Sequence, residues 1–163
     1  VTGMKTVLLK KKLIEHSNMS IKAFNIRDIN KDQLKERAFA EAYKIHMGKS
    51  KKPLKQARID CLKGHPAEIN LLNCGYTDNF EKYMDVNKPD GTPVDCKVIV
   101  YKGSAHFITA LRENRRRAMI AKRQYTYAEE LYQYTLDNKT GDYCLEEIAV
   151  WDGVSFKIQY RNK

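Results

Sequence analysis

The sequence predicts a single α/β (α+β) domain in which helices flank a mixed central β-sheet, with a helical N-terminal region and a β-hairpin that carries the candidate site. Three observations support this prediction. The chain has 163 residues, close to the usual size of one domain. Apolar residues follow the helical period between residues 30 and 75. They follow the strand period of two between residues 80 and 101, and two further strands are expected between residues 143 and 160.

The first helix is predicted to run from Asn30, a favourable N-cap, to Gly48, a favourable C-terminal residue. Leu34, Ala38 and Ala42 lie at helical spacing and would form its buried face. Residues 1–30 are lysine-rich with scattered apolar side chains. Their pattern is too irregular to assign more than one or two weak elements.

A second helix is predicted to begin at Pro53, because proline is well tolerated in the first turn. Residues 64 and 65, a glycine and a histidine, interrupt this helix. Pro66 then begins a short third helix, which Gly75 closes. Glu68 would occupy the third position of that short helix.

A β-hairpin is predicted in the middle of the chain. Residues 80–87 alternate between two sets of side chains, as in a strand, and residues 88–93 are rich in turn formers. Residues 94–101 are rich in Val and Ile, which favour a second strand.

The remainder of the chain is predicted to return to helix and then to strand. Residues 104–136 have a helical composition with one break near Thr126. Residues 143–160 form two strands hinged at Asp152 and Gly153. The predicted order is therefore helices, hairpin, helices and two strands.

The charge is unevenly distributed along the chain, whose formal net charge is +10. Residues 1–64 carry 16 Lys and Arg against 6 Asp and Glu, whereas residues 65–103 carry 4 against 6. We therefore divide the single domain, residues 1–163, into a basic, mostly helical N-terminal region over 1–64 and a core over 65–160. The basic excess predicts a polyanionic partner. The net acidic balance of residues 65–103 either reflects chance variation in composition or indicates a cation between these carboxylates and a bound phosphate backbone.

The cysteines and the hydropathy exclude several classes of protein. Cys61, Cys74, Cys96 and Cys144 are widely separated and show neither the CxxC spacing of a zinc site nor a disulfide framework. No stretch approaches the roughly 20 apolar residues that span a bilayer, and the lysine-rich N-terminus lacks the apolar core of a signal peptide. We therefore expect a cytoplasmic protein with no membrane partner.

The second strand of the hairpin carries a polar face opposite an apolar one. Asp95 and Lys97 are two residues apart and share one face, whereas Val94 and Cys96 point to the other. Asp85 on the partner strand joins them only in an even register, with Asp85 opposite Asp95 or Lys97. The sequence leaves open an odd register, which would separate the carboxylates.

A third carboxylate can reach the same place. If the helix that holds Glu68 packs beside the hairpin, Glu68 meets Asp85 and Asp95. Carboxylates at one point repel each other, and a divalent cation such as Mg²⁺, which prefers oxygen ligands, relieves the repulsion. Lys97 can then orient or help deprotonate a water while the cation stabilises charge on a phosphate. This combination is suited to phosphodiester hydrolysis.

The same residues resemble the core of the PD-(D/E)xK nuclease superfamily. In that family a helix bears Glu, a strand bears Asp, and the next strand bears Asp or Glu, any residue and then Lys. A helix and a fourth strand follow, so the likeness covers roughly residues 60–124. The matching segments are GHPAE (64–68), YMD (83–85) and PVDCKV (93–98). The resemblance implies a restriction-endonuclease-like core, Mg²⁺ or substituting Mn²⁺ as cofactor, metal ligands Glu68, Asp85 and Asp95, and the catalytic set Glu68, Asp85, Asp95 and Lys97.

These acidic residues also have structural explanations. Asp90 follows a proline and matches the family's Pro-Asp literally, but it precedes Gly91 in an evident turn, so Asp85 is the preferred ligand. Glu68 in the first turn of a helix is favourable without any metal, because it faces the positive end of the helix dipole. Asp85 and Lys97 can form a cross-strand ion pair.

Other residues near the candidate site have two readings as well. Cys96 is predicted to belong to the core. His65 and His106 flank the site, but a lone histidine is more often a cap or a surface group than a catalyst. Four tyrosines can stack on bases or form a buried helical stripe: Tyr125, Tyr127, Tyr132 and Tyr134.

A basic helix is predicted directly after the hairpin, and arginines there suit contacts with phosphates. A second basic surface is predicted near the break between the first two helices, although lysine runs are frequently only solvated. The residues predicted to bind nucleic acid are Arg112, Arg115, Arg116, Arg117, Lys122, Arg123, Lys51, Lys52 and Lys55.

The predicted function is a metal-dependent DNA endonuclease, of restriction or junction-resolving type, that hydrolyses phosphodiester bonds with a metal-activated water. RNA is not excluded as substrate, and the resemblance leaves a homodimer open. The alternative is a non-enzymatic basic nucleic-acid-binding or assembly protein in which the carboxylates make ion pairs. The sequence lacks the GxxxxGK[ST], GxSxG and HExxH motifs of nucleotide hydrolases, esterases and zinc proteases.

Overall fold

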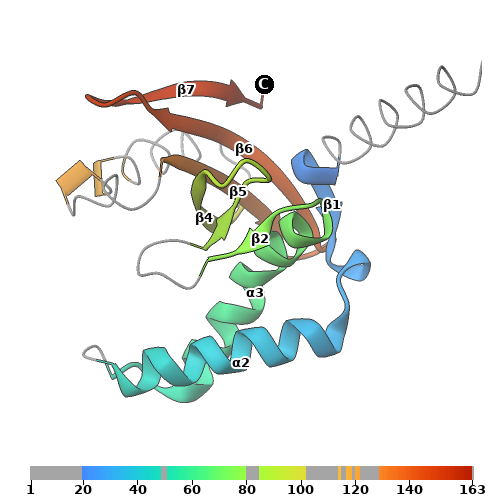
Figure 1. Ribbon diagram of the computed structural model, residues 1–163. Coiled ribbons are helices and arrows are strands. Elements are labelled where there is room, and N and C mark those ends of the chain that lie inside the picture. Colours follow the sequence, from blue (N-terminus) through green and yellow to red (C-terminus); the bar gives the residue numbers. More distant parts are fainter. Residues whose placement is uncertain are drawn as a thin grey trace, which may run out of the picture.

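The computed structural model describes residues 20–48, 51–79, 85–101, 114, 117–118, 120–121 and 129–162 (Figure 1). These residues form a mixed α+β structure, as predicted. The helical elements are the 3-10 helix η1 (Ile26–Asp28), α2 (Lys31–Met47) and α3 (Leu54–Asn73). The strands are β1 (Ala23–Asn25), β2 (Thr77–Asp78), β3 (Val86–Asn87), β4 (Pro93–Val100), β5 (Glu130–Asp137), β6 (Asp142–Trp151) and β7 (Phe156–Arg161).

The strands of the described residues make one curled, mixed sheet in the order β1-β6-β5-β4-β3-β2, and β7 also pairs with β6 (Figure 1). β4 and β5 run parallel, and the other neighbouring strands run antiparallel. A parallel pair requires a crossover connection. Residues 101–129 make this connection, and the few of them that lie within helix in the described part are Asn114, Arg117, Ala118, Ile120 and Ala121.

α2 begins and ends where the sequence predicts. The Oδ1 atom of Asn30 accepts a hydrogen bond from the amide of Gln33 over 2.9 Å, which caps the first turn. Gly48 follows the last residue of the helix. Leu34, Ala38 and Ala42 are buried, and they face α3, against which α2 packs. No helix among the described residues has both the length and the apolar character needed to cross a bilayer.

α3 is one continuous helix of 20 residues, so the predicted interruption at residues 64 and 65 is wrong. The predicted division at residue 64 falls inside this helix. Pro66 lies within it and costs a backbone hydrogen bond, but the proline side chain is fully buried, and this burial offsets the loss. Glu68 is therefore deep in a helix and not in a first turn. The helix dipole does not account for its position.

The chain turns sharply after α3. Gly75 has a φ of 97°, in the left-handed region that glycine tolerates, and its amide donates to the carbonyl oxygen of Leu72 over 3.2 Å. This glycine closes the helix as predicted. The sequence did not predict the short β2 that follows, which pairs with β3.

The predicted hairpin is present between β3 and β4. Its turn is closed by the amide of Lys88, which donates to the carbonyl oxygen of Thr92 over 2.9 Å. Asp90 accepts a hydrogen bond from the amide of Thr92 over 2.9 Å, so it is a turn residue, as the sequence predicted. Of the predicted first strand, residues 80–84 lie outside the described residues.

The predicted helix over 104–136 is wrong at its C-terminal end, because residues 130–137 form β5. This strand is buried on both faces. Residues 132–137 alternate apolar and polar side chains (Tyr, Gln, Tyr, Thr, Leu, Asp), a strand pattern that the helical prediction for this segment did not take into account. The two C-terminal strands are confirmed as β6 and β7. Asp152 accepts hydrogen bonds from the amides of Val154 and Ser155, each over 2.8 Å, in the turn between them.

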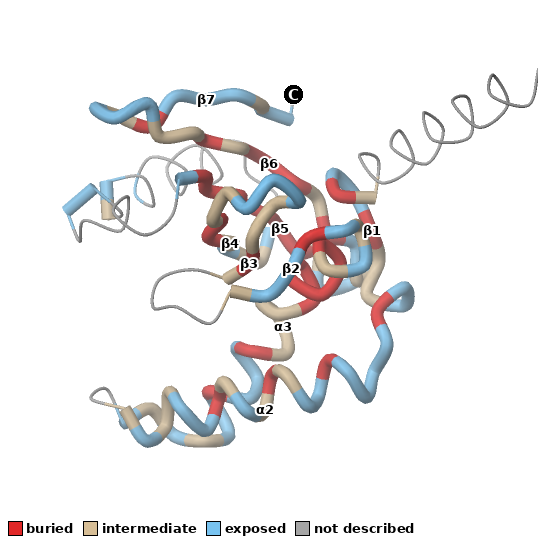
Figure 2. The backbone as a smooth tube through the Cα atoms, in the orientation of Figure 1, coloured by how far each residue is buried: buried red, intermediate tan, exposed pale blue. Residues whose placement is uncertain are grey.

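Apolar side chains are buried on both faces of the sheet. The larger cluster joins β4, β5 and β6 to α2 and α3 and includes Ile69, Val94, Tyr134 and Leu145. A smaller cluster on the other face centres on Leu131. Figure 2 shows the buried segments concentrated in β5, β6 and the part of α3 near the sheet, whereas β7 and much of α2 are exposed. The candidate site lies where α3 meets the edge of β4.

Candidate active site

Asp85 lies at the point where β3 stops pairing with β4. The last pair of this ladder is Val86 with Val94, which is one of the even registers that the sequence required. Asp85 itself lies beyond the ladder, and its amide donates to the carbonyl oxygen of Val94 over 3.0 Å. The amide of Cys96 donates to Oδ2 of Asp85 over 2.7 Å. A side-chain carboxylate thus replaces the backbone acceptor that a longer β3 would supply to β4.

The two faces of β4 differ as predicted. In the parallel ladder with β5, Cys96 lies beside Tyr132 on the face that packs against α3. Lys97 lies beside Gln133 on the opposite face, and Asp95 shares that face because it is two residues away. Asp95 is only 6% exposed, whereas Lys97 is exposed. Asp95 and Lys97 therefore lie on the face of β4 opposite to the one that packs against α3, the helix that carries Glu68.

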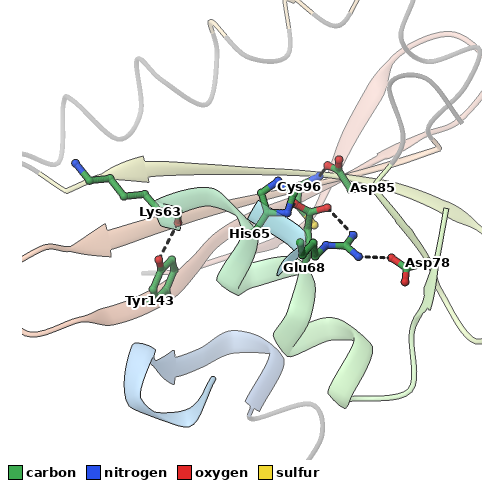
Figure 3. A network of polar contacts seen from close by, with 8 residues as sticks. Lys63, His65, Glu68, Asp78, Asp85, Cys96 and Tyr143 are labelled. Atoms are coloured by element: carbon green, nitrogen blue, oxygen red, sulfur yellow. Dashed lines mark hydrogen bonds and ion pairs between the residues drawn. The ribbon is translucent and has the colours of Figure 1, made fainter. Parts of the chain in front are cut away.

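Glu68 reaches the edge of β4 from α3. Glu68 is 7% exposed, and its Oε1 atom lies 3.1 Å from Nη2 of Arg37 on α2. The same guanidinium uses Nη1 to bind Asp78 on β2. Figure 3 shows Glu68 beside His65, Asp85 and Cys96, with Asp78 on its other side. Arg37 thus fixes Glu68 by joining α2, α3 and β2.

Glu68, Asp85 and Asp95, which we call the carboxylate cluster, interact electrostatically. Burial raises the pKa of Glu68 to about 7, although Arg37 acts in the opposite direction, and the charge of Asp95 raises it further. Burial also raises the pKa of Asp85 well above its usual range, and the charges of Glu68 and Asp95 add to this effect. A side-chain hydrogen bond links Asp85 to Asp95, which requires a proton on one of them.

His65 lies beside the carboxylate cluster on α3. Its Nδ1 atom is 3.6 Å from Oε2 of Glu68, and its side chain is 13% exposed. Burial, followed by the charge of Arg37, lowers the pKa of His65 to about 4. The ring is therefore neutral at pH 7. His65 is neither a helix cap nor an exposed surface group, the roles that the sequence suggested for it.

The donor atoms of the carboxylate cluster suit a hard divalent cation, which prefers carboxylate oxygens. Within the described residues, no group of three or more His, Cys, Asp or Glu side chains is already arranged around a common metal position. Glu68 is held by Arg37, and Asp85 is held by the amide of Cys96. A bound cation would therefore share these oxygens with contacts that already exist.

Only part of the predicted nucleic-acid surface is described. Arg117, Lys51 and Lys55 are exposed. Lys52 is half-buried and forms an ion pair with Asp60. These positions are compatible with contacts to phosphates but do not identify a partner. The other predicted members lie outside the described residues: Arg112, Arg115, Arg116, Lys122 and Arg123.

The tyrosines of β5 are core residues. The hydroxyl groups of Tyr132 and Tyr76 are 2.6 Å apart, and the hydroxyl of Tyr134 donates to the carbonyl oxygen of Ile21 over 2.8 Å. Both β5 tyrosines are no more than 2% exposed, so the prediction that they stack on bases is wrong. Tyr125, Tyr127 and His106 lie outside the described residues.

No sequence pattern indicates the roles of Arg37 and Asp78. Arg37 is one of 30 Lys and Arg residues and lies 31 positions before Glu68. Asp78 lies 41 positions after Arg37 and directly follows a turn. No local pattern predicts contacts at these separations, because they depend on how α2 packs on α3.

Comparison of the chain with protein-family models, with curated proteins and with solved structures gives no significant match in any of the three. The function is therefore argued from the site itself.

Proposed function

We propose that this protein is a metal-dependent DNA endonuclease that hydrolyses phosphodiester bonds with a metal-activated water. The observation that carries the proposal is the carboxylate cluster. Three acidic side chains, Glu68 from a helix, Asp85 from a strand end and Asp95 from a strand, interact there, and burial together with the charges of the neighbouring carboxyl groups raises the pKa of Glu68 and of Asp85. Strongly perturbed carboxyl groups are frequent at active sites, because catalysis requires such shifts.

Glu68, Asp85 and Asp95 are the residues that would hold the cation. Their oxygens match the preference of Mg²⁺ and Mn²⁺, and positive charge beside them would offset the repulsion that raises the pKa of Asp85. When bound, such an ion supplies positive charge that polarises a phosphate oxygen and lowers the pKa of a coordinated water.

The remaining roles fall to residues of the chain. Lys97 shares the face of Asp95 and would orient the attacking water or assist its deprotonation. Arg37 would hold Glu68 in one rotamer through its contact with Oε1. Glu68 on α3, Asp85 just before β3 and Asp95 on β4 follow one another in the chain order of helix, strand and strand on which the resemblance to the PD-(D/E)xK nucleases is based, and this order supports the proposal.

The substrate class follows from charge. The net charge of +10 favours a polyanion, and Arg117, Lys51 and Lys55 are exposed for phosphate contacts. DNA is the proposed substrate. RNA carries the same backbone charge, so competition between labelled DNA and unlabelled RNA of equal length distinguishes the two.

A second function is favoured by one observation. Glu68 already forms an ion pair with Arg37, as expected of a structural carboxylate. In a non-enzymatic nucleic-acid-binding or assembly protein, the carboxylate cluster would serve only to join α3 to the sheet. Such a protein would bind DNA without cutting it.

Plasmid cleavage tests the proposal. The wild type should nick or linearise supercoiled DNA with Mg²⁺ or Mn²⁺ and should be inactive with EDTA. Asp95→Asn and Lys97→Ala should each reduce the rate at least about 100-fold, the usual contribution of a catalytic group. Asp90→Asn is the matched control, because Asp90 lies in the exposed turn of the same hairpin, and it should cleave at the wild-type rate.

Two outcomes would contradict the proposal. If the wild type binds DNA but yields no product with any divalent metal, the non-enzymatic alternative holds. If Asp95→Asn and Lys97→Ala cleave like the wild type, the catalytic site lies elsewhere in the chain.

A further inference from the structure

His65 and Glu68 present a nitrogen and an oxygen to each other within α3. Residues three apart occupy the same face of a helix, and Nδ1 of His65 lies 3.6 Å from Oε2 of Glu68. This separation is too long for a hydrogen bond. Arg37 binds the other carboxylate oxygen, Oε1, so the guanidinium and the imidazole lie on different oxygens of Glu68.

The Nδ1 atom of His65 is buried and makes no hydrogen bond within the part of the chain that the structure describes. Buried polar atoms of native proteins are nearly always paired, so an unpaired nitrogen of this kind requires an explanation. A neutral imidazole carries a lone pair on one ring nitrogen. A histidine can therefore act as a metal ligand through that nitrogen.

The spacing of the two atoms fits a shared ion. Two ligands that each bond one metal at about 2.1 Å are about 3.4 Å apart at the tetrahedral angle. The observed 3.6 Å is close to this value.

We propose that His65 Nδ1 and Glu68 Oε2 form a mixed nitrogen and oxygen site for a first-row transition-metal ion, and that His65 makes the carboxylate cluster select such an ion over Mg²⁺. Imidazole is a good ligand for Zn²⁺ and similar ions and a poor one for Mg²⁺, which prefers oxygen. The inference rests on the proposed function in that Glu68 is shared, and it deepens that function by naming the class of metal.

Calorimetric titration with Zn²⁺ and with Mg²⁺ separates the contributions of the two ligands. The wild type should bind Zn²⁺ at least tenfold more tightly than Mg²⁺. His65→Gln should weaken Zn²⁺ binding at least tenfold and leave Mg²⁺ binding within twofold, whereas Glu68→Gln should weaken both. His46→Gln is the control, because Nδ1 of His46 already contacts the backbone oxygen of Lys52 at 2.8 Å, and it should bind like the wild type.

A second measurement needs no variant and guards against misfolding of His65→Gln. In nitrogen-15-labelled wild type, Zn²⁺ should shift the Nδ1 resonance of the His65 ring more than that of the other histidines. An unchanged His65 resonance, or equal Zn²⁺ affinity of His65→Gln and the wild type, would overturn the inference. Cleavage with Mg²⁺ decides the proposed function separately. If Zn²⁺ binds at His65 but no DNA is cleaved, the metal site is supported and the endonuclease function is contradicted. If the wild type binds neither Zn²⁺ nor Mg²⁺, both proposals are contradicted.

Discussion

Acidic side chains are buried beside β4 in two places, and the two places differ in how the negative charge is compensated. Glu130 begins β5 next to Val94, and Nζ of Lys88 lies 2.9 Å from its Oε2, so one carboxylate has one cation. In the carboxylate cluster, Asp85 instead faces an amide and two other carboxyl groups. The first arrangement stabilises the fold. The second arrangement lowers stability, because like-charged groups are buried close together.

Substitution of Lys88 removes the cation that pairs with Glu130. Lys88→Gln leaves a carboxylate with 7% side-chain exposure and no ammonium partner, and we expect the free energy of unfolding to fall by about 2 kcal/mol at pH 8. This value is below that of a fully buried pair because the Lys88 side chain is 30% exposed. Chemical denaturation measures it.

The double variant Lys88→Gln with Glu130→Gln is the control for this prediction. Because it removes the buried charge together with its partner, it should be more stable than Lys88→Gln alone. If the single and double variants are equally destabilised, the ion pair is not the cause of the loss, and the contrast with the carboxylate cluster fails.

Asp85→Asn should stabilise the protein, whereas Lys88→Gln should destabilise it. The raised pKa of Asp85 means that the folded state favours the protonated form. The contribution of this group to stability is therefore greatest at low pH, falls as the pH rises from the usual carboxyl range to the raised pKa, and is constant above it. Asn cannot ionise and still accepts the hydrogen bond from Cys96. We expect it to raise the unfolding temperature at pH 8 by about 3 °C, which corresponds to about 1 kcal/mol.

The pH dependence sharpens this prediction. The advantage of Asp85→Asn should shrink as the pH falls below about 7, where Glu68 also becomes protonated, and should vanish near pH 4. Added Mg²⁺ at pH 8 should raise the unfolding temperature of the wild type but not of Asp85→Asn, because only the wild type keeps the ligand. An Asp85→Asn protein that is less stable than the wild type at pH 8 would show that the cluster is a structural feature.

The smallest effect is expected at the exposed pair of Lys52 and Asp60. Both side chains are 42% exposed, and ion pairs in such positions contribute little. Lys52→Ala should change the free energy of unfolding by less than about 0.5 kcal/mol. If Lys52 contacts DNA, the same variant should lower the slope of log affinity against log salt by about one. Unchanged salt dependence would remove Lys52 from the nucleic-acid surface.

Local signals predicted much of the fold that surrounds the site. The caps of α2, the turn of the β3–β4 hairpin and the alternation of Asp95 and Lys97 each depend on neighbouring residues, and each is present in the structure. Two elements were mispredicted for different reasons. α3 continues through Pro66, whose side chain is fully buried, and no local pattern indicates this burial. β5 has a local signal, the alternation of residues 132–137, but the prediction assigned this segment to a helix.

The sequence by itself determined which side chains can meet. The period of two along β4 set Asp95 and Cys96 on opposite faces, and it required an even hairpin register for Asp85 to approach Asp95. The sequence left the register open, and the structure has an even one, with Val86 paired to Val94. Tertiary structure decided the environment in which they meet. Arg37 reaches Glu68 only because α2 packs on α3, and the burial that perturbs Glu68, Asp85 and His65 arises from contacts between segments far apart in the chain. Desolvation depends on everything that surrounds a group, and a linear pattern does not contain that information.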